Sequence, residues 1–307
     1  MTLAPATPLL RALAVATGFL LSTGDVQAQG IPTRSTLEKI RGSGTLLIGY
    51  REGAAPFSYL DANGQPIGFS LDLCRHVADA IRTKLQLAEL KVIQIPTTPS
   101  SRQIMLESEA LDLNCGSVTN TNQRKRSVAF SVSTFVAGVQ ALTRKDTGIH
   151  SLKDMAGKTV VSPADTNADA AVRAAATRHD LSLNFRQGRD QADSLRLLLG
   201  GEADVMVLDD VLLRGLLLTL PAEVREKLLV LDEKYGFEPH GLEFRRQDPQ
   251  FKRLIDDTLI GLMNSGEFAR IYDKWFTSPI PPPGANLDLP MSDALKQLIR
   301  TPNDRGV

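Results

Sequence analysis

The amino-acid sequence predicts an α/β protein built from two successive blocks of alternating strands and helices. Short apolar segments of strand length recur in both halves of the chain, and the segments between them carry apolar residues at helical spacing. This alternation is typical of open sheets with helices on both faces, which bind ligands beyond the carboxyl ends of their strands. A length of 307 residues predicts two domains, and 42% hydrophobic residues are enough for two cores.

The first block opens with a compact apolar strand at 45–50. Residues 57–60 and 67–70 predict a hairpin, in which Asn63-Gly64 supplies the positive φ angles of a tight turn. A helix over 71–85 and a strand over 91–95 come next, and a helix, a strand and a loop then lead to Cys115.

The second block starts near Gly138 and continues the alternation. After it, the chain returns through a strand, two helices, a proline-rich linker and a small amphipathic tail. The second block comprises strands at 159–162, 183–185 and 203–208 and helices at 167–178 and 194–199; the return comprises a strand at 241–245, helices at 248–263 and 266–275, and the linker at 280–284.

The first 28 residues have the pattern of a cleavable signal peptide. Arg11 is the only charge before an apolar run at 12–21, which is too short to span a bilayer, and Val26-Gln-Ala28 fits a cleavage site. We therefore expect cleavage after Ala28 and export of a soluble chain to a bacterial periplasm, with a retained anchor as the alternative. Removing these residues takes away one positive and one negative charge, so the net charge stays at zero. A neutral chain offers no general field for nucleic acid or anionic lipid, so a charged ligand must be recognised locally.

Cys74 and Cys115 are the only cysteines. In an oxidising compartment they permit one disulfide. Cys74 also lies in an apolar helical stripe, where it could be a buried free thiol. The sequence leaves both readings open, because it does not give the distance between the two residues.

The loop from Cys115 to Arg124 has the chemistry to hold a carboxylate. Its Gly, Ser, Thr and Asn residues offer hydroxyl and amide donors, and its final arginine can grip a carboxylate with two hydrogen bonds. Arg51 and Asp209 also lie at the ends of predicted strands, where ligands of such sheets bind. A zwitterionic ligand with an extra carboxylate needs such a set of arginines and one acid. Taken singly, each arginine could equally be a solvated surface charge.

The sequence matches none of the common motifs of enzymes and metal sites. The histidines His76, His150, His179 and His240 lie far apart without metal-ligand spacing, and Gly157-Lys158-Thr159 lacks the first glycine of a phosphate loop and leads into a strand. We expect no catalytic residues, no metal and no cofactor. The alternatives are a periplasmic enzyme on the same fold, such as a dehydratase acting on a cyclic acid, and an amino-acid-sensing module. An enzyme would have Glu52 or Asp209 as its candidate general acid or base.

Several segments together carry a family resemblance over essentially the whole mature chain. They are Tyr50-Arg51-Glu52, Pro56-Phe57-Ser58-Tyr59, Gly68-Phe69-Ser70-Leu71-Asp72-Leu73, Cys115-Gly-Ser-Val-Thr-Asn-Thr with Arg124, Leu208-Asp209-Asp210, Asp248-Pro-Gln-Phe251 and Lys274-Trp-Phe with Pro279-Ile-Pro-Pro282. The chain resembles the periplasmic amino-acid-binding proteins of ABC importers (bacterial solute-binding protein family 3), in particular the glutamate/aspartate-binding subgroup.

The resemblance implies a two-lobed periplasmic-binding-protein fold of type II, with a mixed sheet flanked by helices in each lobe. Lobe 1 would comprise 31–136 and 239–307, lobe 2 would comprise 137–238, and the two crossings would form a hinge. The protein would be a monomer that captures glutamate or aspartate in the interlobe cleft. It would deliver the amino acid to an ABC permease in the inner membrane and catalyse nothing itself.

The resemblance also implies a role for each site residue. Ser117, Thr119 and Arg124 would hold the α-carboxylate together with Thr166, and Asp209 would pair with the α-ammonium. Arg51 and Arg102 would grip the side-chain carboxylate. Three positions depart from the subgroup: Pro99 replaces a serine, with Thr98 or Ser100 as substitutes, Pro163 replaces a threonine, with Ser162 as substitute, and Gln191 replaces a histidine near the ligand.

Overall fold

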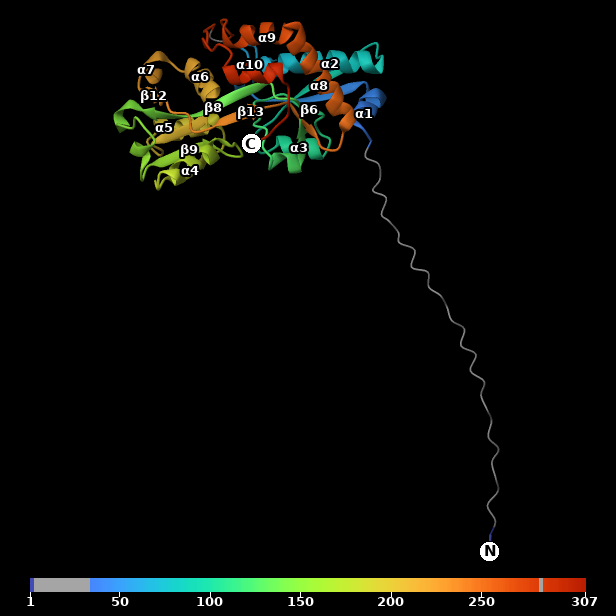
Figure 1. Cartoon of the computed structure of the whole chain (residues 1–307), viewed down its shortest axis with the longest axis horizontal. Coiled ribbons are helices and arrows are strands. Elements are labelled where there is room, and N and C mark those ends of the chain that lie inside the picture. The colour runs from blue at the N-terminus through green and yellow to red at the C-terminus, as the bar shows by residue number, and fades with distance from the viewer. Residues whose placement is uncertain (3–33, 282–283) are drawn as a thin grey trace. The chain divides into compact units, whose positions relative to one another are not determined.

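The computed structural model describes residues 1–2, 34–281 and 284–307, so the predicted signal peptide lies outside the described residues except for its first two. Residues 34–307 form one compact unit that contains two larger sheets and a small one. In Figure 1 the middle of the chain, coloured green to yellow, gathers on one side of this unit, and the blue and red segments from the two ends gather on the other. Within the described part of the chain, no helix has the length and apolar character to cross a bilayer.

The first sheet is formed by segments from both ends of the unit. Its strand order is β5-β1-β6-β14-β7, with β1 parallel to β5 and β6, and β14 antiparallel to β6 and β7. The strands are β1 (Thr45–Tyr50), β5 (Lys91–Pro96), β6 (Leu113–Asn114), β7 (Val128–Phe130) and β14 (Glu243–Arg245); the associated helices are α1 (Thr36–Ser43), α2 (Phe69–Leu85), α3 (Arg102–Glu107), α8 (Pro249–Ser265) and α9 (Glu267–Phe276).

The second sheet has the order β10-β9-β11-β8-β12, and β13 pairs with the first part of β8. β9, β10 and β11 are parallel, and the long β8 runs antiparallel to β11. The strands are β8 (Phe135–Arg144), β9 (Thr159–Pro163), β10 (Asn184–Gly188), β11 (Val205–Asp209), β12 (Leu228–Val230) and β13 (Phe237–His240); the helices are α4 (Ala168–Arg178), α5 (Gln191–Leu199), α6 (Asp210–Leu218), α7 (Ala222–Arg225) and the C-terminal α10 (Asp293–Arg300), which touches both α8 and β8.

A small third sheet confirms the predicted hairpin and its tight turn, although only the glycine of Asn63-Gly64 has a positive φ. β2 (Gly53–Ala54), β3 (Ser58–Leu60) and β4 (Pro66–Ile67) form it, and Tyr59 pairs with Ile67. Residues 61–65 connect β3 and β4, and the Gly64 amide donates to the Asp61 carbonyl at 3.0 Å, with a φ of 73° at Gly64. The Asp61 carboxylate stabilises this loop by accepting hydrogen bonds from two of its backbone amides, at 2.8 Å each. The short side chain of aspartate thus sets the turn here.

Cys74 and Cys115 form a disulfide, with their Cα atoms 6.4 Å apart. The bond joins α2 to the loop that follows β6, and both cysteines are completely buried. This settles the question that the sequence left open. The disulfide anchors the first residue of the loop that carries Ser117, Thr119 and Arg124.

Aromatic side chains from distant segments join α2 and α9 to the residue before β3 and to the start of β8. Phe57, Phe69, Phe135, Tyr272 and Phe276 pack with ring centroids between 4.3 and 6.2 Å apart. All five are at least 95% buried. Edge-to-face and offset contacts of this kind add to the energy of burial. Because Phe135 begins β8, the cluster also fixes the start of the strand that leads into the second sheet.

Candidate functional site

The site residues lie at the carboxyl ends of parallel strands in both sheets, as the fold class predicts. Arg51 follows β1, and Arg102 begins α3 after β5. The loop from Cys115 follows β6. On the second sheet, Thr166 follows β9, Gln191 begins α5 after β10, and Asp209 ends β11.

Short-range contacts hold Arg51 in place at the end of β1. Its backbone amide donates to Ser58 Oγ at 2.8 Å, and that hydroxyl donates back to the Arg51 carbonyl at 3.1 Å. The neighbouring Tyr50 carbonyl accepts from the Thr97 hydroxyl at 2.9 Å. Gly49 allows this close packing, because a Cβ there would lie 2.8 Å from Leu111. The backbone under Arg51 is therefore fixed by both β3 and the end of β5.

All the ligand-binding residues that the sequence predicts line one pocket, which we call the central pocket. Its volume is about 30 Å³, which is room for one or two water molecules. An amino acid can therefore occupy it only after side chains shift or the two sheets move apart. The lining residues are Arg51, Pro99, Arg102, Ser117, Thr119, Arg124, Asp165, Thr166, Asn167, Gln191, Leu208, Asp209, Leu212 and Glu238.

Arg124 connects the loops of the two sheets. Its Nη1 donates to the Thr119 carbonyl at 2.8 Å, and its Nη2 donates to the Asp165 carbonyl at 2.9 Å. Burial, together with repulsion from Arg102, lowers the pKa of Arg124 to about 10, so the side chain remains charged at neutral pH. A charged guanidinium in this position can bind an anion and stabilise the approach of the two sheets.

The hydroxyls of Thr119 and Thr166 are engaged inside the protein. Thr119 Oγ1 donates to Glu238 Oε2, and Thr166 Oγ1 donates to the Pro163 carbonyl at 2.7 Å. A hydroxyl has a single proton to donate. For these two residues to donate to a ligand carboxylate, their hydroxyls must turn away from their present partners.

Arg102 has a buried partner that the sequence does not reveal. Its Nε donates to Glu243 Oε2 at 3.1 Å, and its Nη1 donates to the Pro99 carbonyl at 2.7 Å. Arg51 has no such partner among the described residues. Burial and repulsion from Arg102 lower the pKa of Arg51 to about 10, and Asp190 opposes this shift. The two arginines are therefore not equivalent, since Arg102 is paired with a buried carboxylate and Arg51 is not.

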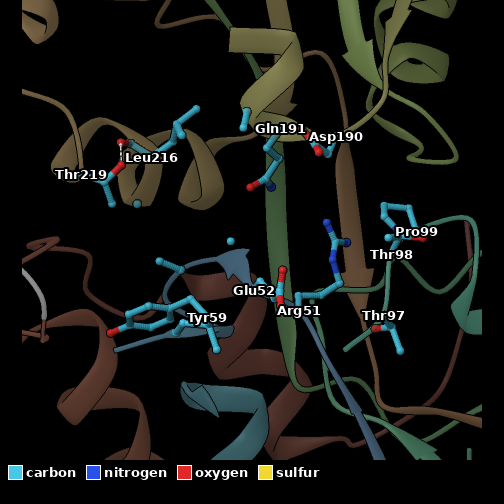
Figure 2. Close-up of a pocket in the computed structure, with 15 residues that line it drawn as sticks. Arg51, Glu52, Tyr59, Thr97, Thr98, Pro99, Asp190, Gln191, Leu216 and Thr219 are labelled. Carbon is cyan, nitrogen blue, oxygen red and sulfur yellow. Dashed lines mark hydrogen bonds between the residues drawn. The ribbon is translucent and has the colours of Figure 1, made fainter. Parts of the chain in front are cut away.

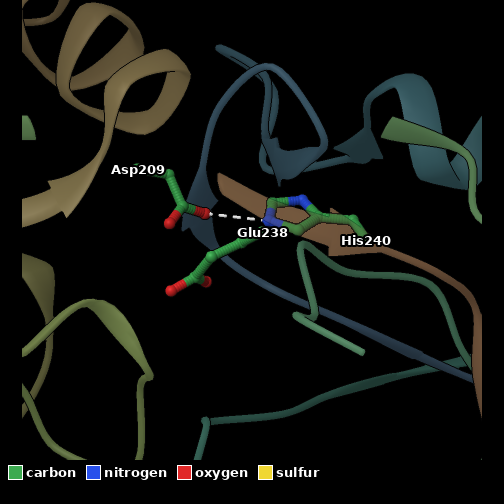
Figure 3. A group of neighbouring side chains, drawn as sticks. All are labelled: Asp209, Glu238 and His240. Atoms are coloured by element: carbon green, nitrogen blue, oxygen red, sulfur yellow. Dashed lines mark ion pairs between the residues drawn. The ribbon is translucent and has the colours of Figure 1, made fainter. Parts of the chain in front are cut away.

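Asp209 belongs to a buried cluster with Glu238 and His240 (Figure 3). Asp209 Oδ2 lies 3.1 Å from His240 Nε2, and one donor atom from each of the three side chains lies within 4.8 Å of the others. Asn167 Nδ2 donates to Glu238 Oε1 at 2.9 Å. Burial and the charge of Asp209 raise the pKa of Glu238. Two carboxylates in one buried place attract a cation such as an ammonium group, and among the described residues this is the one cluster whose donors could also hold a metal ion.

A second, larger cavity of about 410 Å³ adjoins the central pocket and shares Arg51, Pro99 and Gln191 with it. We call it the outer cavity. In Figure 2 the side chains of Arg51 and Gln191 reach from opposite sides toward the same space, with Asp190 and Pro99 beside them. The other lining residues are Glu52, Gly53, Ala55, Tyr59, Leu60, Thr97, Thr98, Ala192, Gly215, Leu216 and Thr219.

Several residues at the site are absent from the sequence prediction. Glu238 and Asn167 line the central pocket, and Glu243 and His240 contact residues that line it. Glu238 lies 119 residues from Thr119, and Glu243 lies 141 residues from Arg102. No local pattern marks these acids. The position of Glu243 within a predicted strand could have indicated a buried ion pair, because a fully buried carboxylate requires a partner.

Comparison with known proteins places the chain in a family. The family model for bacterial extracellular solute-binding proteins, family 3, matches residues 46–278. The L-glutamate/L-aspartate-binding protein of Pseudomonas aeruginosa is 37% identical over 272 residues, which cover 88% of this chain and 89% of the relative. The glutamate/aspartate import solute-binding protein of Escherichia coli is 34% identical over 303 residues, which cover 99% of this chain and 98% of the relative.

Solved structures share the fold. Holo ArgBP from T. maritima superposes with a TM-score of 0.64 at 26% identity, covering 78% of this chain and 98% of that one. The ancestral amino acid-binding protein AncCDT-1, a precursor of cyclohexadienyl dehydratase, gives a TM-score of 0.65 at 27% identity, covering 79% of this chain and 99% of that one. With its two sheet-bearing lobes and a pocket at their strand ends, this chain belongs to family 3 of the bacterial extracellular solute-binding proteins.

Proposed function

We propose that the protein captures glutamate or aspartate between its two lobes and delivers it to the permease of an ABC importer in the inner membrane. The single observation that carries the proposal is that three arginines and Asp209 line the same central pocket. An acidic amino acid has two carboxylates and one ammonium group, and each buried charge needs a partner. Relatives named for glutamate and aspartate support the same ligand class.

The ligand would bind with its α-carboxylate at Arg124, Ser117, Thr119 and Thr166 and its ammonium group at Asp209. Its side-chain carboxylate would meet Arg51, with Arg102 and Gln191 close by. Lobe 1 would comprise 31–136 and 239–307, and lobe 2 would comprise 137–238. Ligand binding would favour the closed population of a hinge at the two crossings. We expect a periplasmic monomer that is exported by means of residues 1–28.

Isothermal titration calorimetry with L-glutamate, L-aspartate, L-glutamine and L-asparagine tests the ligand class. We expect the acids to bind at least as tightly as their amides. Tighter binding of both amides than of both acids would contradict the preference for acidic ligands, and no binding of any of the four would contradict the function.

Replacing Arg124 by alanine tests the binding of the α-carboxylate. Two charge-assisted hydrogen bonds of about 1.5–3 kcal/mol each would be lost, so we expect Kd to rise at least 100-fold for every amino-acid ligand. Arg126→Ala is the matched control, because Arg126 is exposed and lies on the same 3₁₀ turn, η1 (Arg124–Arg126). Equal binding by the Arg124 and Arg126 variants would contradict the assignment.

One observation favours an enzyme as the second candidate. Glu238 has a raised pKa and lies near buried His240, as a general acid would. We propose that the chain is not an enzyme, because the Glu238 carboxylate accepts hydrogen bonds from Thr119 and Asn167, which fix its position beside the ammonium partner Asp209. Mass spectrometry of glutamate, and of cyclic acids, after incubation with the protein should show them unchanged. A product that forms in proportion to protein concentration would favour the enzyme.

A further inference from the structure

One of the two cations expected to meet the ligand's side chain, Arg102, is already paired with a buried carboxylate. Glu243 is completely buried and holds Arg102 through the 3.1 Å contact with Nε. Asn114 Nδ2 donates to the same carboxylate oxygen at 3.2 Å, which fixes its position. Separating a buried ion pair is costly, because each charge would be left without a partner. Arg102 therefore adds less positive potential to this end of the pocket than an unpaired arginine would, although its charge still lowers the pKa of Arg51.

The other cation, Arg51, also has a carboxylate in its surroundings. The charge of Asp190 favours the ionised guanidinium of Arg51, and the adjacent Gln191 is neutral. The formal charges of Arg51, Arg102, Glu243 and Asp190 thus sum to zero, although at Arg51 the repulsion from Arg102 exceeds the attraction of Asp190. A ligand carboxylate gains less over an uncharged carboxamide here than it would from two unpaired guanidiniums. Arg51 can donate to the oxygen of either group.

The outer cavity provides space beyond Arg51. Its volume of about 410 Å³ is more than ten times that of the central pocket, and Arg51, Pro99 and Gln191 line both. Apolar groups such as Leu60 and Leu216 form part of its wall. A substituent on the distal end of the ligand could therefore pass between Arg51 and Gln191 and lie against apolar surface.

We propose that the site also binds γ-glutamyl amides, that is, glutamate whose distal carboxyl carries an amide-linked substituent. The α-amino and α-carboxyl groups occupy the central pocket, the γ-carbonyl oxygen accepts from Arg51, and the substituent lies in the outer cavity. Glu243 determines this tolerance by neutralising Arg102. The inference rests on the proposed function, because it uses the same recognition of the amino-acid head.

Calorimetry on the wild-type protein with L-glutamate, L-glutamine and γ-L-glutamylethylamide tests the ligand class. We expect both amides to bind within about tenfold of glutamate. An ethylamide that binds more than about 100-fold more weakly than glutamate overturns the inference and leaves the proposed function standing. No binding of any of the three overturns both. If the ethylamide binds and glutamate does not, the inference is supported and the preference for acidic ligands is overturned.

Two variants test the parts played by the cavity and by Glu243. Ala192 is exposed and lines the outer cavity, so Ala192→Trp places a large side chain in that cavity. The variant should weaken binding of the ethylamide by at least about tenfold and binding of glutamate by less than about threefold. Ala170→Trp, on an exposed position of α4, is the matched control. An Ala192 variant that weakens both ligands equally, or neither, overturns the placement of the substituent.

Glu243→Gln removes the neutralising charge while keeping the shape of the side chain. It should increase the preference for glutamate over glutamine by at least about tenfold, because Arg102 then presents its full charge. An unchanged ratio overturns the role of Glu243. If this buried variant does not fold, as judged by circular dichroism, the Ala192 pair still decides the inference.

Discussion

Replacing Gly215 by alanine should hinder closure of the cleft without destabilising either sheet. Gly215 lies on α6, which packs on the second sheet, and it faces Ala55, which follows β2 of the small sheet. A Cβ at this position would lie 2.3 Å from the Ala55 carbonyl oxygen. Unstrained contacts begin near about 3.5 Å, so the two segments must separate by roughly 1 Å.

With the proposed hinge, the cost of this separation would fall on the closed arrangement, in which Gly215 meets Ala55. Overpacking of this size costs about 1–3 kcal/mol, which corresponds to an increase in Kd of about 5- to 150-fold. Alanine is favoured over glycine within a helix by roughly 0.5–1 kcal/mol, so the melting temperature without ligand should not fall.

The assay is calorimetry with L-glutamate, combined with small-angle scattering of the ligand-saturated protein. Gly261→Ala on α8 is the matched control, because a Cβ there meets nothing within 4 Å. We expect weaker binding and a larger radius of gyration for the Gly215 variant alone. Affinities within about twofold of each other for the two variants would refute the reasoning.

Two further predictions concern Glu238 and the disulfide. Because the pKa of Glu238 is raised in the folded protein, the wild type is relatively most stable below the pKa of an unfolded glutamate, and it loses stability as pH rises through the folded value. Glu238→Gln should therefore raise the melting temperature more at about pH 8 than at about pH 4; the opposite trend in calorimetric scans would contradict the shift. The double variant Cys74→Ser and Cys115→Ser opens a loop with a sequence separation of 41 and should lose about 4 kcal/mol in urea unfolding, where a loss below about 1 kcal/mol would contradict a structural role.

The local features of the site could be predicted from the sequence. Arg51 and Asp209 follow apolar segments that form buried strands, and the rule that ligands bind at carboxyl ends of strands places both in one cleft. The loop from Cys115 to Arg124 combines donors with a terminal arginine, and its Ser117, Thr119 and Arg124 line the central pocket. These positions depend on short-range patterns, which a single sequence contains.

The long-range partners could not be predicted. Glu243 pairs with Arg102 from a return strand, and nothing near either residue in the sequence encodes the pairing. The helix α6 was also missing from the prediction, because its run of leucines gives no clear helical period. The sequence could not decide whether the disulfide forms, because this too depends on long-range packing. The separation of Cys74 and Cys115 is set by how α2 packs against the first sheet.

A crystal structure of the protein with L-glutamate tests the central claim most directly. The account predicts that the α-carboxylate lies within hydrogen-bonding distance of Arg124, the ammonium group beside Asp209 and the side-chain carboxylate at Arg51. A ligand bound in the reverse orientation, with its side-chain carboxylate at Arg124, would contradict the account, and so would a ligand bound outside the central pocket.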